Sequence, residues 1–201
     1  MTTPGFRKGR SAGGRNTSDR DGADGFISGS MFSQAQILHL MKAEFARARR
    51  HGLSLGCLLL QVDRIPHLVD LYGVELRPTL RQTLIQLVRE HTRGADLIGM
   101  IQEDRYMLVL PHTNVEQARV VAERLHGIFN KCEVGVGGRV LNLTLSVGIS
   151  ATGQSDAMFF DTLVGQAEAA LDFAVGQGGD RVLSFGETQL LGQDPTAPHQ
   201  D

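Results

Sequence analysis

The sequence predicts an α/β sandwich in which helices flank a mixed sheet of about five strands. Three observations support this fold class. Segments with the spacing of amphipathic helices alternate with short apolar runs of strand length. Two pairs of strand-like runs in the middle of the chain follow one another closely, as the arms of β-hairpins do. A polar stretch lies at each end, so we expect one domain, at residues 30–186, with two tails.

Helices are predicted where apolar residues recur at intervals of three and four. The first covers residues 32–50 and ends in basic residues, which helix C-termini favour. Two more are expected at 79–91 and 158–175. The run Thr113-Asn114-Val115-Glu116 looks like a capping box that opens a further helix, ending near Phe129. Its apolar stripe consists of Val115, Ala118, Ala122, Leu125 and Phe129.

Strands are predicted at the apolar runs between these helices. Residues 53–62 form a continuous apolar run and predict a central strand. Residues 181–185 predict a last short strand. The predicted hairpins join 96–101 to 106–110, and 132–136 to 139–150 through a turn at Gly137-Gly138.

The first hairpin has an unusual turn sequence. Tight hairpin turns need positive φ at one or two positions, which glycine adopts at little cost. Gln102-Glu103-Asp104 contains no glycine. We therefore expect a longer or bulged turn that does not need one.

Composition argues against several classes of protein. The net charge of −2 over 201 residues gives no basic field that would attract nucleic acid or a membrane surface. No apolar run approaches the ~18 residues of a membrane span, and the N-terminus lacks the apolar segment of a signal peptide. Cys57 and Cys132 are interpreted as core residues in a reducing compartment, so we expect a cytoplasmic protein.

The two ends of the chain are too polar to offset the entropy of ordering, and residues 1–25 and 187–201 are expected to be disordered. The first is locally basic. A solvated tail and a docking arm for an acidic partner both fit this composition. The sequence between the tails contains no Walker-type phosphate loop, no nucleophile elbow and no histidine pair at metal-ligand spacing.

An ordered set of segments between residues 30 and 185 resembles the GGDEF domain of diguanylate cyclases. The set comprises residues 46–52 (ARARRHG), 61–63 (QVD), 70–73 (DLYG), the central hairpin, 143–150 (LTLSVGIS) and 167–171 (AEAAL). The resemblance implies a nucleotidyl-cyclase-like sandwich. In that family the hairpin carries the signature turn: its glycines let the backbone approach GTP, and its acidic residues serve metal binding and catalysis. Two GTP-loaded domains then condense to cyclic di-GMP.

The sequence departs from the family pattern at most catalytic positions. The signature turn reads Gln102, Glu103, Asp104, Arg105 and Tyr106. The family's metal-binding Asp aligns with Gln61, its guanine-reading Asn and Asp with Val69 and, within a residue, Pro78, and its phosphate-binding Lys and Arg with Val175 and Gly179. A neutral amide is a poor ligand for Mg²⁺, and phosphoryl transfer depends on metal and cationic groups. We therefore expect no cyclase activity, no bound magnesium and no other cofactor.

One feature of the resemblance is retained upstream of the turn. Members of the family often carry an inhibitory R-x-x-D site, five residues before the turn, that binds cyclic di-GMP. Arg93 and Asp96 match it in register, and Arg124 matches a second arginine on the following helix. An arginine can bind guanine O6 and N7 or a phosphate, and a carboxylate can accept hydrogen bonds from guanine N1 and N2.

The resulting hypothesis is an inactive domain that serves as a cyclic di-GMP receptor and acts through an unknown protein partner, with ligand-dependent homodimerisation also open. In the simplest alternative, Arg93 to Asp96 is a surface turn and Arg124 a solvated helix residue. The domain would then be a ligand-independent interaction scaffold. A GTP-binding module without cyclase activity and an active cyclase are the least favoured readings.

Overall fold

The computed structural model describes residues 31–136, 138–153 and 159–192. The chain divides into a first unit at residues 1–30, outside the described ranges, and a second that begins at Met31. The predicted N-terminal tail therefore lies outside the described residues, as do Gly137 of the predicted second turn and the last residues of the C-terminal tail.

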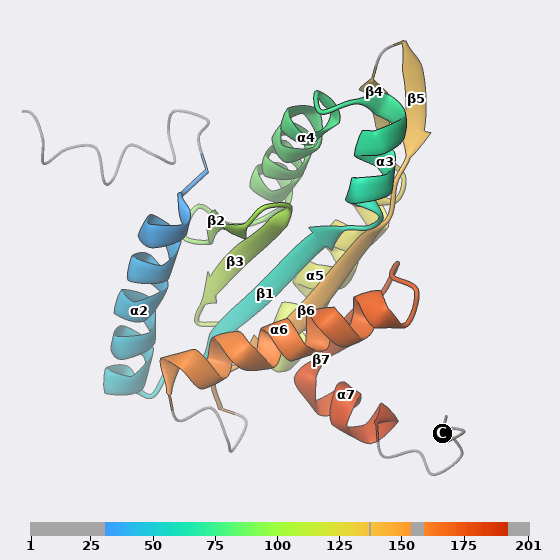
Figure 1. The fold of residues 1–201 in the computed structure, drawn as a ribbon. Coiled ribbons are helices and arrows are strands. Elements are labelled where there is room, and N and C mark those ends of the chain that lie inside the picture. The colour runs from blue at the N-terminus through green and yellow to red at the C-terminus, as the bar shows by residue number, and fades with distance from the viewer. Residues whose placement is uncertain (1–30, 137, 154–158, 193–201) are drawn as a thin grey trace, which may run out of the picture. The chain divides into compact units, whose positions relative to one another are not determined.

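A five-stranded mixed sheet forms the centre of the domain (Figure 1), in the order β2-β3-β1-β6-β7. The strands are β1 (Leu55–Val62), β2 (Leu97–Gln102), β3 (Arg105–Pro111), β6 (Leu145–Ala151) and β7 (Val182–Ser184). Strand β1 pairs antiparallel with β3 and β6, β2 pairs antiparallel with β3, and β7 pairs parallel with β6. The predicted fold class is confirmed.

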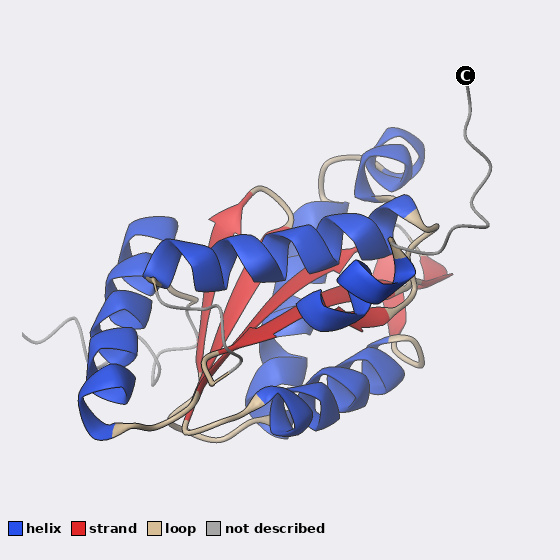
Figure 2. Cartoon of the chain, turned by 90° about the horizontal axis from the view of Figure 1, so that it is seen from below, coloured by secondary structure: helices blue, strands red, loops and turns tan. Residues whose placement is uncertain are grey.

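Helices cover both faces of this sheet, as Figures 1 and 2 show from two directions. Their bounds are α2 (Gln34–His51) and α6 (Phe160–Gly176) on one face, and α4 (Leu76–His91) and α5 (Val115–Phe129) on the other. Alternate side chains of a strand point to opposite faces. On β1, Cys57 and Leu59 therefore join the core under α2 and α6, whereas Leu58 and Leu60 join the core under α4 and α5. Burial raises the pKa of the Cys57 thiol to about 12.

Two short helices were not predicted. Helix α3 (Ile65–Tyr72) has eight residues, too few for the helical period to repeat clearly. Helix α7 (Phe185–Leu191) includes residues 187–191, which were expected to begin the C-terminal tail. Its N-cap Ser184 and Glu187 form a capping box, which stabilises the start of the helix. The helix was not predicted because its residues were assigned to the tail on their polar composition.

The predicted second hairpin is divided between two sheets. β4 (Glu133–Val136) and β5 (Arg139–Asn142) form a separate two-stranded sheet, and β6 begins at Leu145 in the main sheet. The break follows from Asp63, whose carboxylate accepts hydrogen bonds from the hydroxyls of Thr144 and Ser146, each at 2.7 Å. These bonds, with the Asp63 N–H donated to the Thr144 carbonyl, hold residue 144 at the end of β1 and separate β5 from β6.

The capping box of α5 lies one residue later than predicted. Asn114 is the N-cap, and its side chain accepts from the N–H of Gln117, whose side chain accepts from the N–H of Asn114. Thr113 instead donates its hydroxyl to the Pro111 carbonyl. The predicted apolar stripe of α5 is otherwise retained, with Ala118, Ala122, Leu125 and Phe129 buried.

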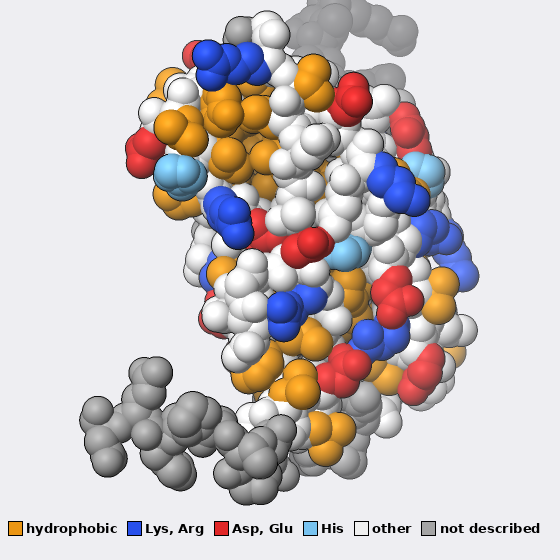
Figure 3. All heavy atoms as spheres, turned by 90° about the vertical axis from the view of Figure 1, so that its right-hand side faces the viewer, with side chains coloured by type: hydrophobic (Ala, Val, Ile, Leu, Met, Phe, Trp, Pro, Cys, Tyr) orange, Lys and Arg blue, Asp and Glu red, His pale blue; other side chains and the backbone are white. Residues whose placement is uncertain are grey.

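Helix α3 and strand β5 lie at the same end of the domain, where the Arg139 guanidinium lies 6.0 Å from the centre of the Tyr72 ring. Three large apolar side chains are exposed on these elements and the turn after α3: Leu71, Val74 and Val140. Figure 3 shows hydrophobic side chains gathered at this end. Among the described helices, none combines the length and the apolar character needed to cross a bilayer.

Candidate functional site

Arg93, Asp96 and Arg124 line one cavity of about 390 Å³. Arg93 and Asp96 belong to the loop between α4 and β2, and Arg124 lies on α5. The loop and the helix meet because α4 and α5 pack side by side on the same face of the sheet. We call this cavity the arginine pocket.

The carboxylate of Asp96 is the buried group of the arginine pocket, with a relative exposure of 4%. Its Oδ2 accepts a hydrogen bond from the backbone N–H of Arg93 at 2.8 Å, which closes the tight turn between them. Burial raises the pKa of Asp96 above its ordinary value, and the bond from Arg93 and the charges of Arg93 and Arg124 oppose that rise. The side chain is thus fixed in place before any ligand arrives.

The two arginine side chains of the pocket are exposed. Within the described ranges, neither guanidinium makes a hydrogen bond or an ion pair closer than 4 Å. Each guanidinium carries five N–H donors in a planar fork that fits a phosphate or the O6/N7 edge of guanine. The arginine pocket therefore combines the donors of two guanidinium groups with a fixed acceptor.

The remaining walls of the arginine pocket were not identified from the sequence. Val121, Val120 and Gln117 lie on α5 three, four and seven residues before Arg124, so they share its face. Val120 is 62% exposed, which makes it an apolar wall open to solvent. Their helical spacing from Arg124 is the pattern by which the sequence could have identified them. His91 and Thr92 of the α4 end, with Leu110 and Thr113, complete the lining.

The signature hairpin turn is short and bulged. Gln102 pairs with Arg105, which leaves only Glu103 and Asp104 in the turn, and the register shifts between Met100 and Gln102. Asp104 has φ of +66°, a left-handed conformation that aspartate adopts more readily than most residues. The expectation of a longer or bulged turn that needs no glycine is confirmed: the hairpin is bulged, and its turn stays short because Asp104 supplies the positive φ.

The residues around this turn, which we call the hairpin region, form ion pairs within the chain, with α6 through Arg105 and with α4 through Arg77. Arg105 donates from Nε to Gln61 Oε1 at 2.8 Å and from Nη2 to Asp172 Oδ1 at 2.6 Å. Arg77 on α4 pairs with Glu103 at 2.7 Å and also with Asp104. The Tyr106 side chain is buried in the core beneath α4.

The other positions that align with nucleotide-binding residues of the family are apolar or lack a side chain. Val69 and Val175 are partly buried and pack against the two cores. Pro78 is exposed in the first turn of α4. Gly179 has φ of +79°, and a Cβ there would lie 2.7 Å from the Asp63 carboxylate, so no arginine fits at this position without moving Asp63.

The hairpin region is a poor fit for a magnesium ion. Mg²⁺ requires oxygen ligands, usually including one or two carboxylates, and the aligned positions supply the amide of Gln61 and the guanidinium of Arg105. Asp104, at the family's first acidic position, is the one carboxylate of the set that could still contact a metal, and it is paired with Arg77. Within the described ranges, no group of three or more His, Cys, Asp or Glu side chains is arranged to hold a metal ion.

Comparison with known proteins agrees with this architecture. Residues 30–181 match the family model "Diguanylate cyclase, GGDEF domain". Diguanylate cyclase DgcP of Pseudomonas aeruginosa is 27% identical over 150 residues, which cover 75% of this chain and 22% of DgcP. The chain thus spans less than a quarter of that relative.

Solved structures give the same result. Diguanylate cyclase SiaD of Pseudomonas aeruginosa, in complex with its activator SiaC, aligns with a TM-score of 0.72 at 26% identity, over 83% of this chain and 62% of SiaD. The GGDEF domain of DgcB from Caulobacter crescentus, in complex with c-di-GMP, has the same fold at 12% identity, with a TM-score of 0.72 over 78% of this chain and 92% of that one. The chain belongs to the diguanylate cyclase GGDEF domain family.

Proposed function

We propose that this chain is a catalytically inactive GGDEF domain that binds cyclic di-GMP in the arginine pocket. The observation that carries the proposal is a contrast between two sets of arginines. Arg93 and Arg124 line a cavity with their guanidinium groups unengaged among the described residues, whereas Arg77 and Arg105 are held in ion pairs in the hairpin region. Ligand recognition therefore fits the arginine pocket and not the hairpin region.

The chemistry of the arginine pocket matches a guanine nucleotide with bridging phosphates. Asp96 can accept from the N1–H and N2–H donors of guanine. One arginine can bind the O6/N7 edge and the other a phosphate oxygen. The apolar side chains of Val120 and Val121 provide a surface for the face of a base. Each of these contacts uses a side chain already at the cavity.

The side chains of the hairpin region also support a loss of catalysis. In-line phosphoryl transfer needs cations placed around the transferring group. The metal and phosphate positions of the family hold Gln61, Arg105 and Val175 in this chain. Arg105 brings positive charge to the hairpin region, but its Nε and Nη2 donors are engaged by Gln61 and Asp172. We infer that GTP finds neither a metal site nor a free phosphate clamp there.

The bound ligand would signal through contacts with another protein in the cytoplasm, or through a homodimer bridged by cyclic di-GMP. A second candidate function is a ligand-independent scaffold. The exposed apolar side chains of Leu71, Val74 and Val140 favour that reading, because apolar surface at one end of a domain suits protein contact.

The test is calorimetric titration of the purified chain with cyclic di-GMP, and separately with GTP and Mg²⁺. We expect saturable binding of cyclic di-GMP only. Arg93→Ala should weaken it about 10- to 150-fold, the equivalent of about 1.5–3 kcal/mol for a hydrogen bond to a charged group. Arg47→Ala, on α2 and paired with Glu44 of the same helix, is the matched control and should bind normally. Absence of cyclic di-GMP binding would leave the scaffold, and product from GTP would refute inactivity.

A further inference from the structure

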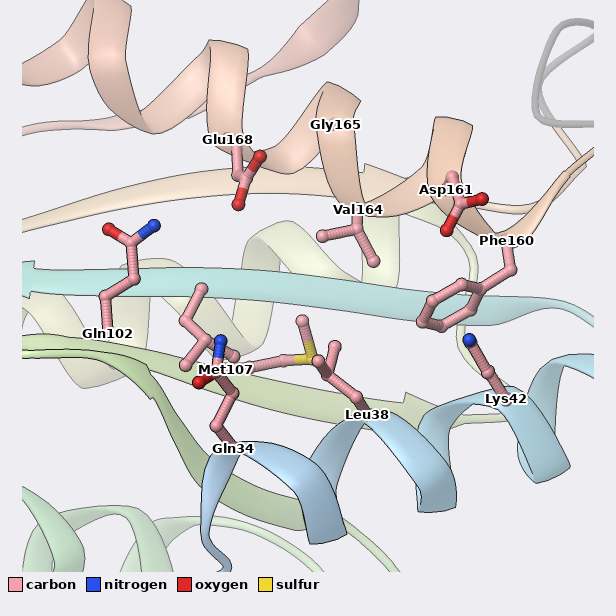
Figure 4. A pocket seen from close by; sticks show the side chains of 11 residues that line it. Gln34, Leu38, Lys42, Gln102, Met107, Phe160, Asp161, Val164, Gly165 and Glu168 are labelled. Carbon is pink, nitrogen blue, oxygen red and sulfur yellow. The ribbon is translucent and has the colours of Figure 1, made fainter.

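A second cavity lies between α2 and α6, on the face of the sheet opposite the core beneath α4 and α5. Its volume is about 340 Å³ (Figure 4). Gln34, Leu38 and Lys42 come from α2, while α6 contributes residues from Phe160 to Glu168. Eight residues of helix rise ~12 Å, which gives the length of this α2–α6 groove along its wall.

The groove has an apolar middle and polar ends. Met107 and Ile101 of the sheet are buried, and Leu38 and Val164 lie on the two walls above them. Figure 4 shows Glu168 and Gln102 near one another at one end of the groove and Phe160, Asp161 and Lys42 at the other. The first end therefore holds a carboxylate and an amide that can accept several hydrogen bonds from one cationic group.

The charges of the groove favour a cation. Asp161 and Glu168 stand two turns apart on α6, and Lys42 is the cation that faces them across the groove. The Lys42 ammonium lies 5.2 Å from the centre of the Phe160 ring, at the end away from Glu168. Glu168 is partly buried, and among the described residues it has no hydrogen-bond or ion-pair partner. Its charge is left to raise the pKa of Cys57 beneath it, as a secondary cause after burial.

Gly165 keeps the groove open at its centre. It lies inside α6, where glycine costs up to about 1 kcal/mol relative to alanine. Its φ is not positive, and a Cβ at this position would meet no atom within 4 Å, so neither backbone geometry nor packing requires glycine. The absent side chain leaves helix backbone exposed to the groove between Val164 and Glu168.

We propose that the α2–α6 groove binds a peptide segment of a partner protein in which an arginine or lysine lies next to large apolar side chains. The basic group binds Glu168 and Gln102, and the apolar side chains cover Met107 and Val164 beside Gly165. The groove is bordered by exposed residues along both helices, so it would leave much of a small molecule in water, whereas a peptide extends beyond its ends. This function does not depend on cyclic di-GMP.

The experiment is selection of a random 12-residue peptide display library on the purified full chain, followed by affinity measurement on variants. Gly165→Leu fills the groove from a helical position that tolerates leucine well. Gly127→Leu is its matched control, because Gly127 is also a helical glycine without neighbours around its Cβ, and it lies on α5. Glu168→Gln removes the charge and keeps the shape. Unchanged circular dichroism and melting temperature verify that each variant is folded.

The expected result is enrichment of peptides that combine a basic residue with large apolar ones. Gly165→Leu should weaken these peptides at least about tenfold, Glu168→Gln about threefold or more, and Gly127→Leu not at all. A library that yields no binder, binders without basic residues, or binders that tolerate Gly165→Leu would each overturn the proposal.

Discussion

Replacing Asp96 by asparagine separates the role of the carboxylate in folding from its role in ligand binding. Asparagine keeps the size of the side chain and retains an oxygen that accepts from the Arg93 N–H, the bond that measures 2.8 Å. It removes a charge that burial disfavours. At pH 7 we therefore expect the free energy of unfolding of Asp96→Asn to equal or exceed that of the native protein.

Asp96→Ala provides the contrast in stability. It leaves the partly buried N–H of Arg93 without an acceptor, which costs about 1–2 kcal/mol. For a chain of this size that loss lowers the melting temperature by about 2–8 °C. Both variants should lose the acceptor pattern for guanine. Asparagine presents an NH₂ to the N1 and N2 donors, so cyclic di-GMP should bind at least ~10-fold more weakly to either variant.

The pH dependence has a definite sign. The pKa of Asp96 is raised above 3.8 in the folded state, so the folded protein holds this proton more tightly than the unfolded chain does. The corresponding stability is fully present below pH 3.8 and is lost as the pH rises through the raised pKa. The free energy of unfolding that Asp96→Asn gains over the native protein should therefore increase as the pH rises through the raised pKa of Asp96, and it should be constant near neutral pH.

Urea unfolding at several pH values and calorimetric titration at pH 7 measure both effects. If Asp96→Asn is as unstable as Asp96→Ala at pH 7, the carboxylate charge is needed for folding and the reasoning from burial is wrong. If Asp96→Asn binds cyclic di-GMP normally, the assignment of this side chain to guanine is wrong.

Three further substitutions test the packing of α6 and the ion pairs of the hairpin region. Gly148→Ala places a Cβ 2.3 Å from the Ala167 carbonyl oxygen and 2.4 Å from the Leu171 nitrogen. It should therefore lower the free energy of unfolding, measured in urea, by about 3 kcal/mol. A loss below ~1 kcal/mol would contradict such close contact of β6 with α6. Gly165→Ala in the same helix has open space and should raise that free energy by up to about 1 kcal/mol, whereas a loss would show that the glycine is required. Arg105→Ala breaks a partly exposed ion pair, so it should lower the free energy of unfolding by under ~1 kcal/mol. The calorimetric affinity for cyclic di-GMP should not change. Weakened binding would show that the hairpin region contributes to ligand binding in the arginine pocket.

Periodicity in the sequence was sufficient for the long elements. The apolar stripes of α2, α4 and α5 and the continuous run of β1 each span enough residues to repeat their period, and all four elements are present in the structure. The two short helices were not predicted, because they are too short for the helical period to repeat. Helices α3 and α7 have eight and seven residues and are fixed by their ends and by packing.

The sequence by itself determined the sandwich of helices on a mixed sheet, the missing glycines of the signature turn and the R-x-x-D register, because each is a local pattern along the chain. Only the tertiary structure decided which of these residues meet. It brings Arg124 close to Arg93 and Asp96, which lie about thirty positions earlier in the chain, since α4 and α5 share a face of the sheet, and it pairs Arg105 with Gln61 and Asp172. The α2–α6 groove likewise arises where three distant segments border one space, and no local pattern records that contact.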